Sequence, residues 1–529
     1  MPTYLSPGVY VEEVPSGSAP IEGVGTAVAA FVGVAEQGPV NEPILVTNWS
    51  QFTQTFGSFV EGSYLALSVY SFFMNGGGSC YVVRVGANGS PPAARAELMA
   101  GTGDKRLAAY RVTALPEGPA GNNLTVEVAD ASTDGKAADK GGGDKGSDKG
   151  GAPKTEDDTF KLLVKDGGQV VEEFDRVTVK QGSQNVLTVV NAQSQFIRIE
   201  EATGTVLAKP TKGSVALSGG GASTQAQLAP DDYVGNAADR TGFGGLEAVD
   251  PVTMVCVPDL MAAYQKGLID LEGVQAVQLA MIAHCELMGD RIAILDPPPG
   301  LNAQQIREWR VDKAGYDSKF AALYWPWIKV FDPASGDNVF VPPSGAMAGI
   351  WGRNDDTRGV HKAPANEVVR GAIALETQIT KNEHDLLNPE GINCIRAFPG
   401  RGIRVWGART LSSDAEWRYL NVRRLFNYLE ESILSGTQWV VFEPNDHALW
   451  AKIRRTISAF LVNEWRKGAL FGQNPDQAFY VKCDDETNPA ESIDAGMVLC
   501  EIGVAPVKPA EFVIFRLSQF SGGTALVAE

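Results

Sequence analysis

Short, almost wholly apolar runs recur along the chain and alternate with stretches of helical pattern. Helices are predicted over Tyr64–Asn75, ended by three glycines, and over Ala262–Met288 with a possible interruption. The apolar runs are, in order, Ala27–Ala35, Cys80–Val85, Val252–Val257 and Arg291–Leu295. Runs this short and apolar are typical of strands buried on both faces, and helices between them serve as crossovers. The pattern predicts an α/β (α+β) fold with a mixed or parallel sheet, and a length of 529 residues predicts several domains.

The alternation stops between residues 90 and 235. Weakly amphipathic strand patterns occur around Leu124–Val128 and Phe160–Val179, and between them lies Ser132–Asp158, composed mostly of Gly, Lys, Asp and Ala. Such a segment has too little apolar surface to offset the entropy of ordering, so it is predicted to be a disordered linker. We interpret the region as an inserted, β-rich surface domain.

Both ends of the chain carry a strand pattern outside any obvious domain. Val9–Val14 alternates within a stretch broken by four prolines, and Glu511–Phe520 forms a second such segment. A lone strand is unstable unless it pairs with another sheet edge. The N-terminal pattern is therefore either a frayed end or a strand that needs a partner.

Two helices are predicted late in the chain. Ser413 and Glu416 have the spacing of a capping box. The helix that they would open has apolar residues at Trp417, Leu420, Leu425, Leu429 and Ile433. The second helix begins at Asn445 or Asp446, either of which can cap it, and ends near Lys467.

The second late helix has one apolar and one basic face. Its apolar positions are Leu449, Ile453, Ile457, Phe460 and Leu461. Lys452, Arg455 and Arg466 fall on the opposite side, although the whole chain has a formal charge of −18. The basic face is either an ordinary solvated surface or a docking site for an acidic partner.

Composition excludes several classes of protein. With 63 acidic and 45 basic residues, the chain repels phosphate and is not expected to bind nucleic acid. No apolar stretch reaches the roughly 18 residues of a membrane span, and the first residues lack a signal-peptide pattern, so no membrane insertion is expected. The six cysteines lack metal or redox spacing and are predicted to be buried free thiols in a reducing compartment. The expected location is the bacterial cytoplasm, before any release in a particle.

The sequence offers no motif for catalysis. None of the four histidines has metal-ligand spacing, and neither a phosphate-binding loop nor a nucleophile elbow is present. Catalytic, cofactor-binding and metal-ligating residues are accordingly not assigned. Asp355 and Asp356 are predicted to lie in a loop, where a salt-bridged turn is favoured over a cation site. An α/β enzyme with a pocket near Pro342–Gly345 and these two carboxylates stays open as an alternative, and it predicts a monomer or small oligomer.

Several motifs occur together in a specific order. They are Leu5–Glu13, Phe72–Gly77, Cys80–Val85, Pro343–Gly349, Arg358–Asn366, Gly391–Asn393, Val405–Thr410 and Ala505–Phe512. In these motifs the chain resembles the tail sheath proteins of contractile phages and related contractile injection systems. The resemblance covers most of residues 1–90 and 245–520.

The resemblance implies a structural subunit that polymerises as stacked hexameric rings around an inner tube and contracts to drive that tube through a target envelope. Its partners would be other copies of itself, the inner tube protein, and baseplate and cap proteins. Terminal arms would pair with strands of neighbours through Val9, Tyr10 and Val11 at one end and through Phe512, Ile514 and Phe515 at the other. The late helix would face the tube with Lys452, Arg455 and Arg466. The alternative is a baseplate or cap protein that shares the fold.

The combined patterns divide the chain into five parts. We expect an N-terminal linking arm over 1–20, an α/β domain over 21–89 with 236–345, the insertion over 90–235 with its linker at 132–158, a C-terminal α/β core domain over 346–508, and a C-terminal linking arm over 509–529.

Overall fold

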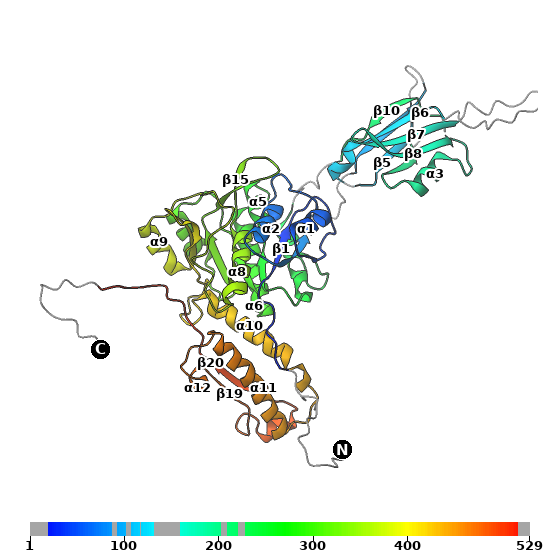
Figure 1. Cartoon of the computed structure of the whole chain (residues 1–529). Helices are drawn as coiled ribbons and strands as arrows, with labels where there is room; N and C mark the ends of the chain where they lie inside the picture. The colour runs from blue at the N-terminus through cyan, green and yellow to red at the C-terminus, as the bar shows by residue number, and fades with distance from the viewer. Residues whose placement is uncertain are drawn as a thin grey trace, which may run out of the picture.

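The computed structural model describes residues 20–86, 93–101, 107–116, 118–131, 159–202, 209–220 and 228–516. The N-terminal strand pattern at Val9–Val14 and the predicted linker Ser132–Asp158 lie outside these ranges. In Figure 1 the described chain forms a main body, a helical unit and a separate β unit.

A mixed eight-stranded sheet forms the centre of the main body, in the order β18-β17-β13-β12-β11-β1-β3-β2. The neighbours from β17 through to β3 run parallel, and β18 and β2 are antiparallel edge strands. The strands are β1 (Val28–Gly33), β2 (Ile44–Val46), β3 (Ser79–Arg84), β11 (Met254–Cys256), β12 (Ile292–Leu295), β13 (Ala321–Trp325), β17 (Ile392–Phe398) and β18 (Gly402–Val405). The four apolar runs thus supply β1, β3, β11 and β12, which confirms the predicted mixed sheet.

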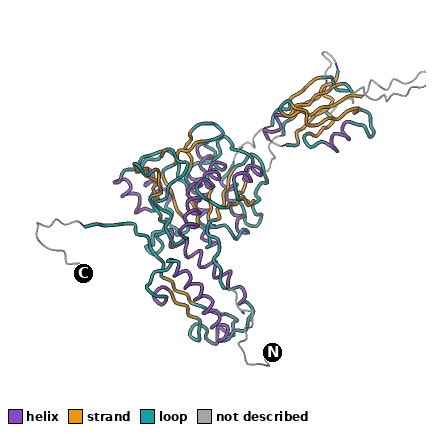
Figure 2. The backbone as a smooth tube through the Cα atoms, viewed as in Figure 1, coloured by secondary structure: helices purple, strands orange, loops and turns teal. Residues whose placement is uncertain are grey.

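Helices cover both faces of this sheet, as Figure 2 shows. One face packs against α5 (Asp259–Gln265) and α6 (Leu271–Met288), and the other against α2 (Leu65–Met74) and α8 (Ser344–Arg358). The predicted helix over Ala262–Met288 is therefore interrupted, with Asp270 capping its second part. Side chains along the strands alternate between the two apolar cores, so the main body has three layers.

Glycines let α8 approach α2 closely. A Cβ atom on Gly345 would lie 2.5 Å from the backbone oxygen of Ser68, and one on Gly349 would lie 2.3 Å from that of Phe72. Larger residues would push the helices apart. Residue 345, the expected domain boundary, lies within α8, and the sheet continues beyond it through β17 and β18.

Smaller elements complete the main body. They are α1 (Trp49–Phe56), α4 (Pro230–Val234), α7 (Ala303–Glu308), α9 (Lys381–Leu387) and a three-stranded sheet of β14 (Ile328–Phe331), β15 (Asn338–Val341) and β16 (Ala374–Leu375). Short 3-10 turns of the main body occur at Gly244–Ala248 and Asn388–Glu390, and a π turn at Trp309–Ala314. Two further 3-10 turns lie outside it, at Gly118–Asn123 in the inserted region and at Gln438–Val440 in the last part of the chain.

The inserted region folds around a core of its own. One sheet contains β4 (Arg95–Ala100), β5 (Leu107–Ala114) and β9 (Ile197–Glu201); the other contains β10 (Gly213–Ala216), β6 (Leu124–Ala129), β7 (Thr159–Asp166) and β8 (Gln169–Thr178). Helix α3 (Val186–Gln193) packs beside them. Every buried residue of this core comes from residues 94–217, so the unit shares no apolar core with the main body.

The last part of the chain forms the helical unit. It contains α10 (Leu420–Gly436), α11 (His447–Arg466), α12 (Pro475–Ala478), α13 (Ala490–Asp494) and a two-stranded sheet of β19 (Phe479–Lys482) and β20 (Glu501–Val504). The second late helix is confirmed, with Asp446 as its cap. The capping box at Ser413 is wrong, because the Ser413 hydroxyl bonds Asp317 and α10 begins only at Leu420.

No helix within the described ranges is both long and apolar enough to cross a membrane. All six cysteines are free thiols; five are buried and Cys500 is half-buried.

Candidate assembly surfaces

Glu511 fixes the start of the C-terminal segment to the body of the protein. Its carboxylate accepts hydrogen bonds from Arg409 Nη2 at 2.6 Å, Arg409 Nε at 2.9 Å and Asn388 Nδ2 at 2.8 Å. The Tyr419 hydroxyl lies 3.3 Å from the same carboxylate. Burial alone would raise the pKa of Glu511, but the bonds from Arg409 and Asn388 lower it below its usual value. The segment is therefore anchored as a charged group at neutral pH.

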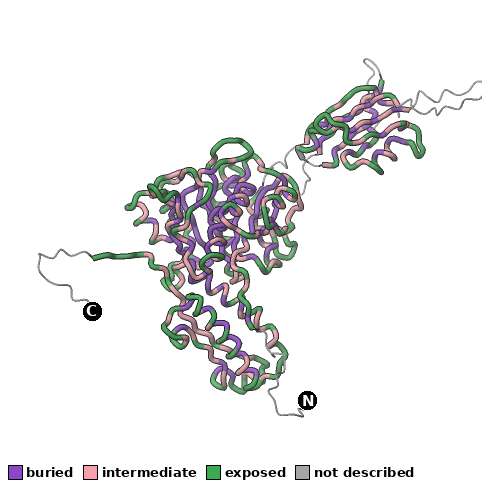
Figure 3. Tube along the Cα trace, viewed as in Figure 1, coloured by how far each residue is buried: buried purple, intermediate pink, exposed green. Residues whose placement is uncertain are grey.

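Beyond Glu511 the C-terminal segment leaves the body, and Figure 3 colours this stretch as exposed. Phe512, Val513, Ile514 and Phe515 are 73%, 66%, 78% and 84% exposed. Residues 511–516 form no strand within the single chain. Four consecutive exposed apolar residues are unusual on a soluble monomer and indicate a surface that another chain covers.

The N-terminal segment begins beside the end of α10. Ile21 is buried against Gly436, where a Cβ atom would lie 2.6 Å from the Ile21 side chain, and the Val24 amide donates to Ser432 Oγ at 3.1 Å. Val9, Tyr10 and Val11, the predicted arm residues, lie outside the described residues. The first described residues therefore lie against α10 of the helical unit.

The sheet of β19 and β20 is a second candidate for pairing between chains. Its four register pairs run from Phe479 with Val504 to Lys482 with Glu501, and β19 packs against α11. The sheet has only these two strands, so each has an outer edge available within residues 228–516. Such edges accept an added strand from another chain.

Helix α11 separates its apolar and basic residues as expected. The five predicted apolar positions are buried, and Arg455 and Arg466 are exposed. Lys452 differs, since it is half-buried with Nζ 3.9 Å from the centre of the Trp439 ring. Arg454, which sequence reasoning did not single out, donates to the backbone oxygen of Cys483 and ties α11 to the end of β19.

A groove of about 1200 Å³ lies where the main body, the helical unit and the C-terminal segment meet. We call it the basic groove, because its charged lining is mostly cationic. The basic residues are Arg358, Lys362, Lys381, Arg396, Arg409, Lys467 and Lys508, and the acidic ones are Asp385 and Glu511. Sequence reasoning missed this groove, since its residues are scattered over 150 positions of a strongly acidic chain.

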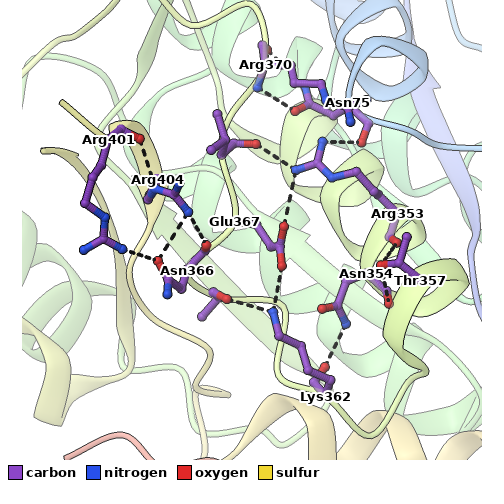
Figure 4. A network of polar contacts seen from close by, with 12 residues as sticks. Asn75, Arg353, Asn354, Thr357, Lys362, Asn366, Glu367, Arg370, Arg401 and Arg404 are labelled. Atoms are coloured by element: carbon purple, nitrogen blue, oxygen red, sulfur yellow. Dashed lines mark hydrogen bonds and ion pairs between the residues drawn. The ribbon is translucent and has the colours of Figure 1, made fainter.

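A polar network fixes one wall of the basic groove (Figure 4). Lys362 Nζ donates to Glu367 at 2.8 Å, and Arg353 donates to the backbone oxygens of Asn75 at 2.8 Å and Val368 at 2.7 Å. Asn366, at a φ of +61°, accepts from Arg401 at 2.9 Å. These bonds hold residues 362–370, part of which belongs to the Arg358–Asn366 motif, against α2, α8 and β18.

The carboxylates predicted to lie in a loop are in α8 instead. Asp355 is buried and pairs with Arg424 of α10 at 2.5 Å, so the predicted salt bridge is confirmed although the predicted loop is wrong. A loop was predicted partly because of Gly352. This glycine packs near Gly77 inside α8 and does not end the helix. No cluster of three or more potential metal ligands occurs among the described residues.

Two other carboxylates are completely buried at helix starts. Asp259 accepts from the amides of Val34 at 2.6 Å and Leu65 at 3.2 Å and from Ser63. Asp296 accepts from the amide and hydroxyl of Ser344. Burial raises the pKa of both, and that of Asp296 to about 7. Each carboxylate joins the end of a strand to the start of a helix, so we assign both a role in holding the fold together.

Two family models match adjoining stretches of the chain. The phage tail sheath protein central domain matches residues 246–411, and the phage tail sheath C-terminal domain matches residues 412–520. Together they span more than half of the 529 residues.

Curated relatives agree with these matches. The tail sheath protein of Burkholderia phage BcepMu is 24% identical, with 96% of this chain and 95% of that protein covered. The tail sheath protein of Vibrio phage KVP40 is 26% identical over 67% of this chain, and a putative prophage major tail sheath protein of Pseudomonas aeruginosa is 27% identical over 46%. The chain spans only 54% and 61% of the length of the latter two proteins.

Solved structures share the fold. The sheath of an extracellular contractile injection system, PVC, in its contracted state superimposes with a TM-score of 0.57 at 23% identity, over 98% of this chain and 99% of that one. The contracted helical sheath of the anti-feeding prophage also has a TM-score of 0.57, at 22% identity, over 98% and 100%. A chain from the baseplate of the anti-feeding prophage has the same score over the same shares.

Proposed function

The chain belongs to the phage tail sheath protein family, and from that premise we propose that it is the structural subunit of a contractile sheath. Copies polymerise as stacked hexameric rings around an inner tube. Contraction of this polymer drives the tube through a target envelope. Assembly takes place in the bacterial cytoplasm, and the finished particle is released.

The C-terminal segment is the observation that carries this proposal. Glu511 holds its base with four polar contacts, while the next four side chains are at least 66% exposed. A segment that is anchored at its base and apolar beyond it suits a strand given to a neighbour. The open edges of β19 and β20 offer a matching acceptor, and the N-terminal residues Val9, Tyr10 and Val11 supply a second arm.

Strand exchange explains how rings move without separating. Main-chain hydrogen bonds link the subunits regardless of side-chain detail, and the segments between arm and body absorb rotation. Improved contacts between subunits supply the free energy of contraction. Interface residues contribute on the order of a few kcal/mol each, and a long polymer adds many such terms. We propose that the subunit catalyses no reaction, which agrees with the structural roles of Asp259 and Asp296.

Arg455 and Arg466 support a tube-facing role for α11. Both are exposed and lie about three turns apart on α11, so they share one side of the helix. On a chain whose net charge is −18, they suit an acidic tube surface. Lys452 contributes by a different route, since its contact with Trp439 supports the helix itself.

Electron microscopy tests the proposal directly. The full chain is expressed with and without an inner tube protein, and negatively stained particles are examined. We expect cylinders of regular pitch in the co-expressed sample, and full-length chain that stays monomeric under both conditions would overturn the proposal. The likeness to a baseplate chain favours a second candidate, a baseplate or cap protein of the same fold. That protein would be present in a few copies per particle instead of forming the dominant band.

A further inference from the structure

The basic groove contains cations that the chain itself leaves without acidic partners. Arg358, Lys381 and Lys508 are exposed, and none of them forms an ion pair with any residue the structure describes. Three of the seven basic residues of the lining are paired: Arg409 with Glu511, Lys362 with Glu367 and Lys467 with Glu464. Asp385 is the other acidic residue of the lining. The groove is therefore a concentrated positive site on a chain of charge −18.

Two buried polar atoms of this lining lack hydrogen-bond partners. They are Nε of Arg396 and Nε2 of His384. Buried polar atoms are normally satisfied, so these two nitrogens are available to a chain that enters the groove. Burial lowers the pKa of His384 below its usual value, so this ring adds no charge of its own at neutral pH.

An acidic surface lies at the far end of the helical unit. We call residues 484–501 the acidic loop, because its exposed charged residues are all acidic. They are Asp485, Glu486, Glu491, Asp494 and Glu501. Lys482, just before the loop, pairs with Glu486, whereas Glu491 and Asp494 form no ion pair with any residue the structure describes. Asn488 holds the loop in shape by accepting from the Leu499 amide at 2.6 Å and donating to the Leu499 carbonyl at 3.0 Å.

The basic groove and the acidic loop lie at opposite ends of α11. Lys467, which lines the groove, follows the last residue of the helix. At the other end His447, the first residue of the helix, lies 3.5 Å from Asp485. Twenty residues of helix at 1.5 Å per residue separate the two surfaces by about 30 Å. A loop fixed at one end cannot reach a groove at the other end of the same molecule.

We propose that the acidic loop of one copy docks in the basic groove of the next copy. The contact joins different surfaces of the two chains, so each copy keeps a free groove at one end and a free loop at the other. Contacts of this kind propagate from copy to copy, as a ring or as an open helical polymer, instead of ending in a two-fold dimer. The inference rests on the proposed function, and it adds to strand exchange a contact between folded units that fixes register by charge.

Charge reversal in two separate variants tests the docking. The groove variant carries Arg358→Glu, Lys381→Glu and Lys508→Glu, and the loop variant carries Asp485→Lys, Glu491→Lys and Asp494→Lys. Each alone sets like charges against each other, so we expect sheath yield with the tube protein to fall by about tenfold or more. When the two variants are mixed, the acidic groove of the groove variant receives the basic loop of the loop variant. The unchanged basic groove of the loop variant receives the unchanged acidic loop of the groove variant, so co-assembly is restored. A chain with all six changes assembles alone for the same reason.

Controls separate this idea from misfolding and from the proposed function. On the inserted unit, reversal of Glu97, Asp130 and Glu200 to Lys matches the charge change of the loop variant. Reversal of Arg111, Arg198 and Lys212 to Glu on the same unit matches that of the groove variant. Both controls leave yield unchanged. Circular dichroism confirms that the variants fold. If a variant misfolds, it is replaced by a milder groove variant with Arg358→Gln, Lys381→Gln and Lys508→Gln. We expect this variant to need a protein concentration about threefold higher for assembly.

The outcomes are distinct. Restoration by mixing supports the docking. Two results would overturn the docking and leave the sheath function standing. In the first, both single variants assemble normally. In the second, the groove variant does not assemble and mixing it with the loop variant does not restore assembly. The second of these results would assign the groove to another acidic segment, such as the one with Glu12 and Glu13. If the unmodified chain forms no polymer, the proposed function and the docking both fail.

Discussion

The Asp355 carboxylate and the Arg424 guanidinium form an ion pair of 2.5 Å with side chains only 3% and 4% exposed. Thr26 joins both partners, since its hydroxyl donates to Asp355 at 2.7 Å and its backbone oxygen accepts from Arg424 at 3.0 Å. The guanidinium also lies 4.8 Å from the centre of the Trp351 ring. One contact therefore connects α8 of the main body, α10 of the helical unit and the chain just before β1.

Replacing Asp355 should destabilise the chain more than any surface change. Asp355→Ala leaves Arg424 buried without its counter-charge, and loss of one partner of a buried pair costs about 3–5 kcal/mol. The measurement is the urea midpoint by tryptophan fluorescence. The matched control is Glu200→Ala, which breaks an exposed contact with Arg198 and should change stability by less than about 0.5 kcal/mol. Equal effects of the two changes would contradict the assigned role.

Glu511→Ala should free the C-terminal segment without unfolding the body. The change removes the acceptor for Arg409, Asn388 and Tyr419, and Arg409 keeps its bond from Nη1 to the Asn388 oxygen at 3.1 Å. Limited proteolysis should cut after residue 511 several times faster than in the unmodified chain. The free energy of unfolding should fall by about 1–3 kcal/mol, because the buried Arg409 loses its acidic partner. The control is Glu501→Ala, an exposed change on β20. Unchanged cleavage would show that other contacts hold the segment.

Local patterns predicted those parts of the fold that depend on local sequence. β1, β3, β11 and β12 come from apolar runs, and Asp446 marks the start of α11 because a cap acts on its own next turn. The predicted capping box at Ser413 is wrong because the Ser413 hydroxyl donates its hydrogen bond to Asp317, a residue distant in sequence, and not within its own helix. Local spacing cannot show such competition.

The groove and the buried pair could not be predicted for a related reason. Asp355 and Arg424 are 69 residues apart, and Arg358 and Lys508 meet the same groove from still more distant positions. Contacts between residues so far apart in sequence depend on the tertiary fold, including the order of strands in the sheet. No local sequence pattern predicts that order. The basic face of α11 was visible because its residues repeat at helical spacing. Even there, the position of Trp439 beneath Lys452 required the structure.

Reversal of the basic residues on α11 should separate a docking effect from a stability effect. Arg455→Glu with Arg466→Glu should leave the urea midpoint unchanged and reduce co-assembly with the tube by about tenfold. Lys452→Glu should instead cost about 0.5–1 kcal/mol of stability, because it removes the contact with the Trp439 ring. Pull-down of the tube protein and urea unfolding are measured on the same samples. Normal tube binding by the double variant would identify this face as a solvated surface.

Asp296 should make the chain less stable as pH rises. Burial raises the pKa of its carboxyl from 3.8 to about 7, so the folded chain holds a proton there that the unfolded chain releases. The stabilisation is complete below pH 3.8 and is lost as pH rises through 7. Asp296→Asn mimics the protonated form, since its amide can donate to Ser344 Oγ while its oxygen accepts from the Ser344 amide. The fall in melting temperature between pH 5 and pH 8 should therefore be smaller in this variant, whereas Asp130→Asn, an exposed control, should leave it unchanged. If the melting temperature of Asp296→Asn falls as much as that of the unmodified chain, the raised pKa of Asp296 is contradicted.

Removal of the whole inserted unit should leave the rest of the chain folded and able to assemble. Its buried core draws only on residues 94–217, and its first and last strands meet where the Arg95 amide donates to the Ser218 oxygen at 2.8 Å and the Ser218 amide donates back at 3.0 Å. Because entry and exit lie side by side, a short glycine–serine linker can replace residues 93–220 without pulling on the main body. The expected result is an unchanged melting transition for the main body and cylinders of the same pitch but smaller outer diameter in negative stain. A variant deleted only in 132–158 serves as the milder control. Loss of cylinders in the larger deletion, with the smaller one normal, would assign the inserted unit a contact between copies.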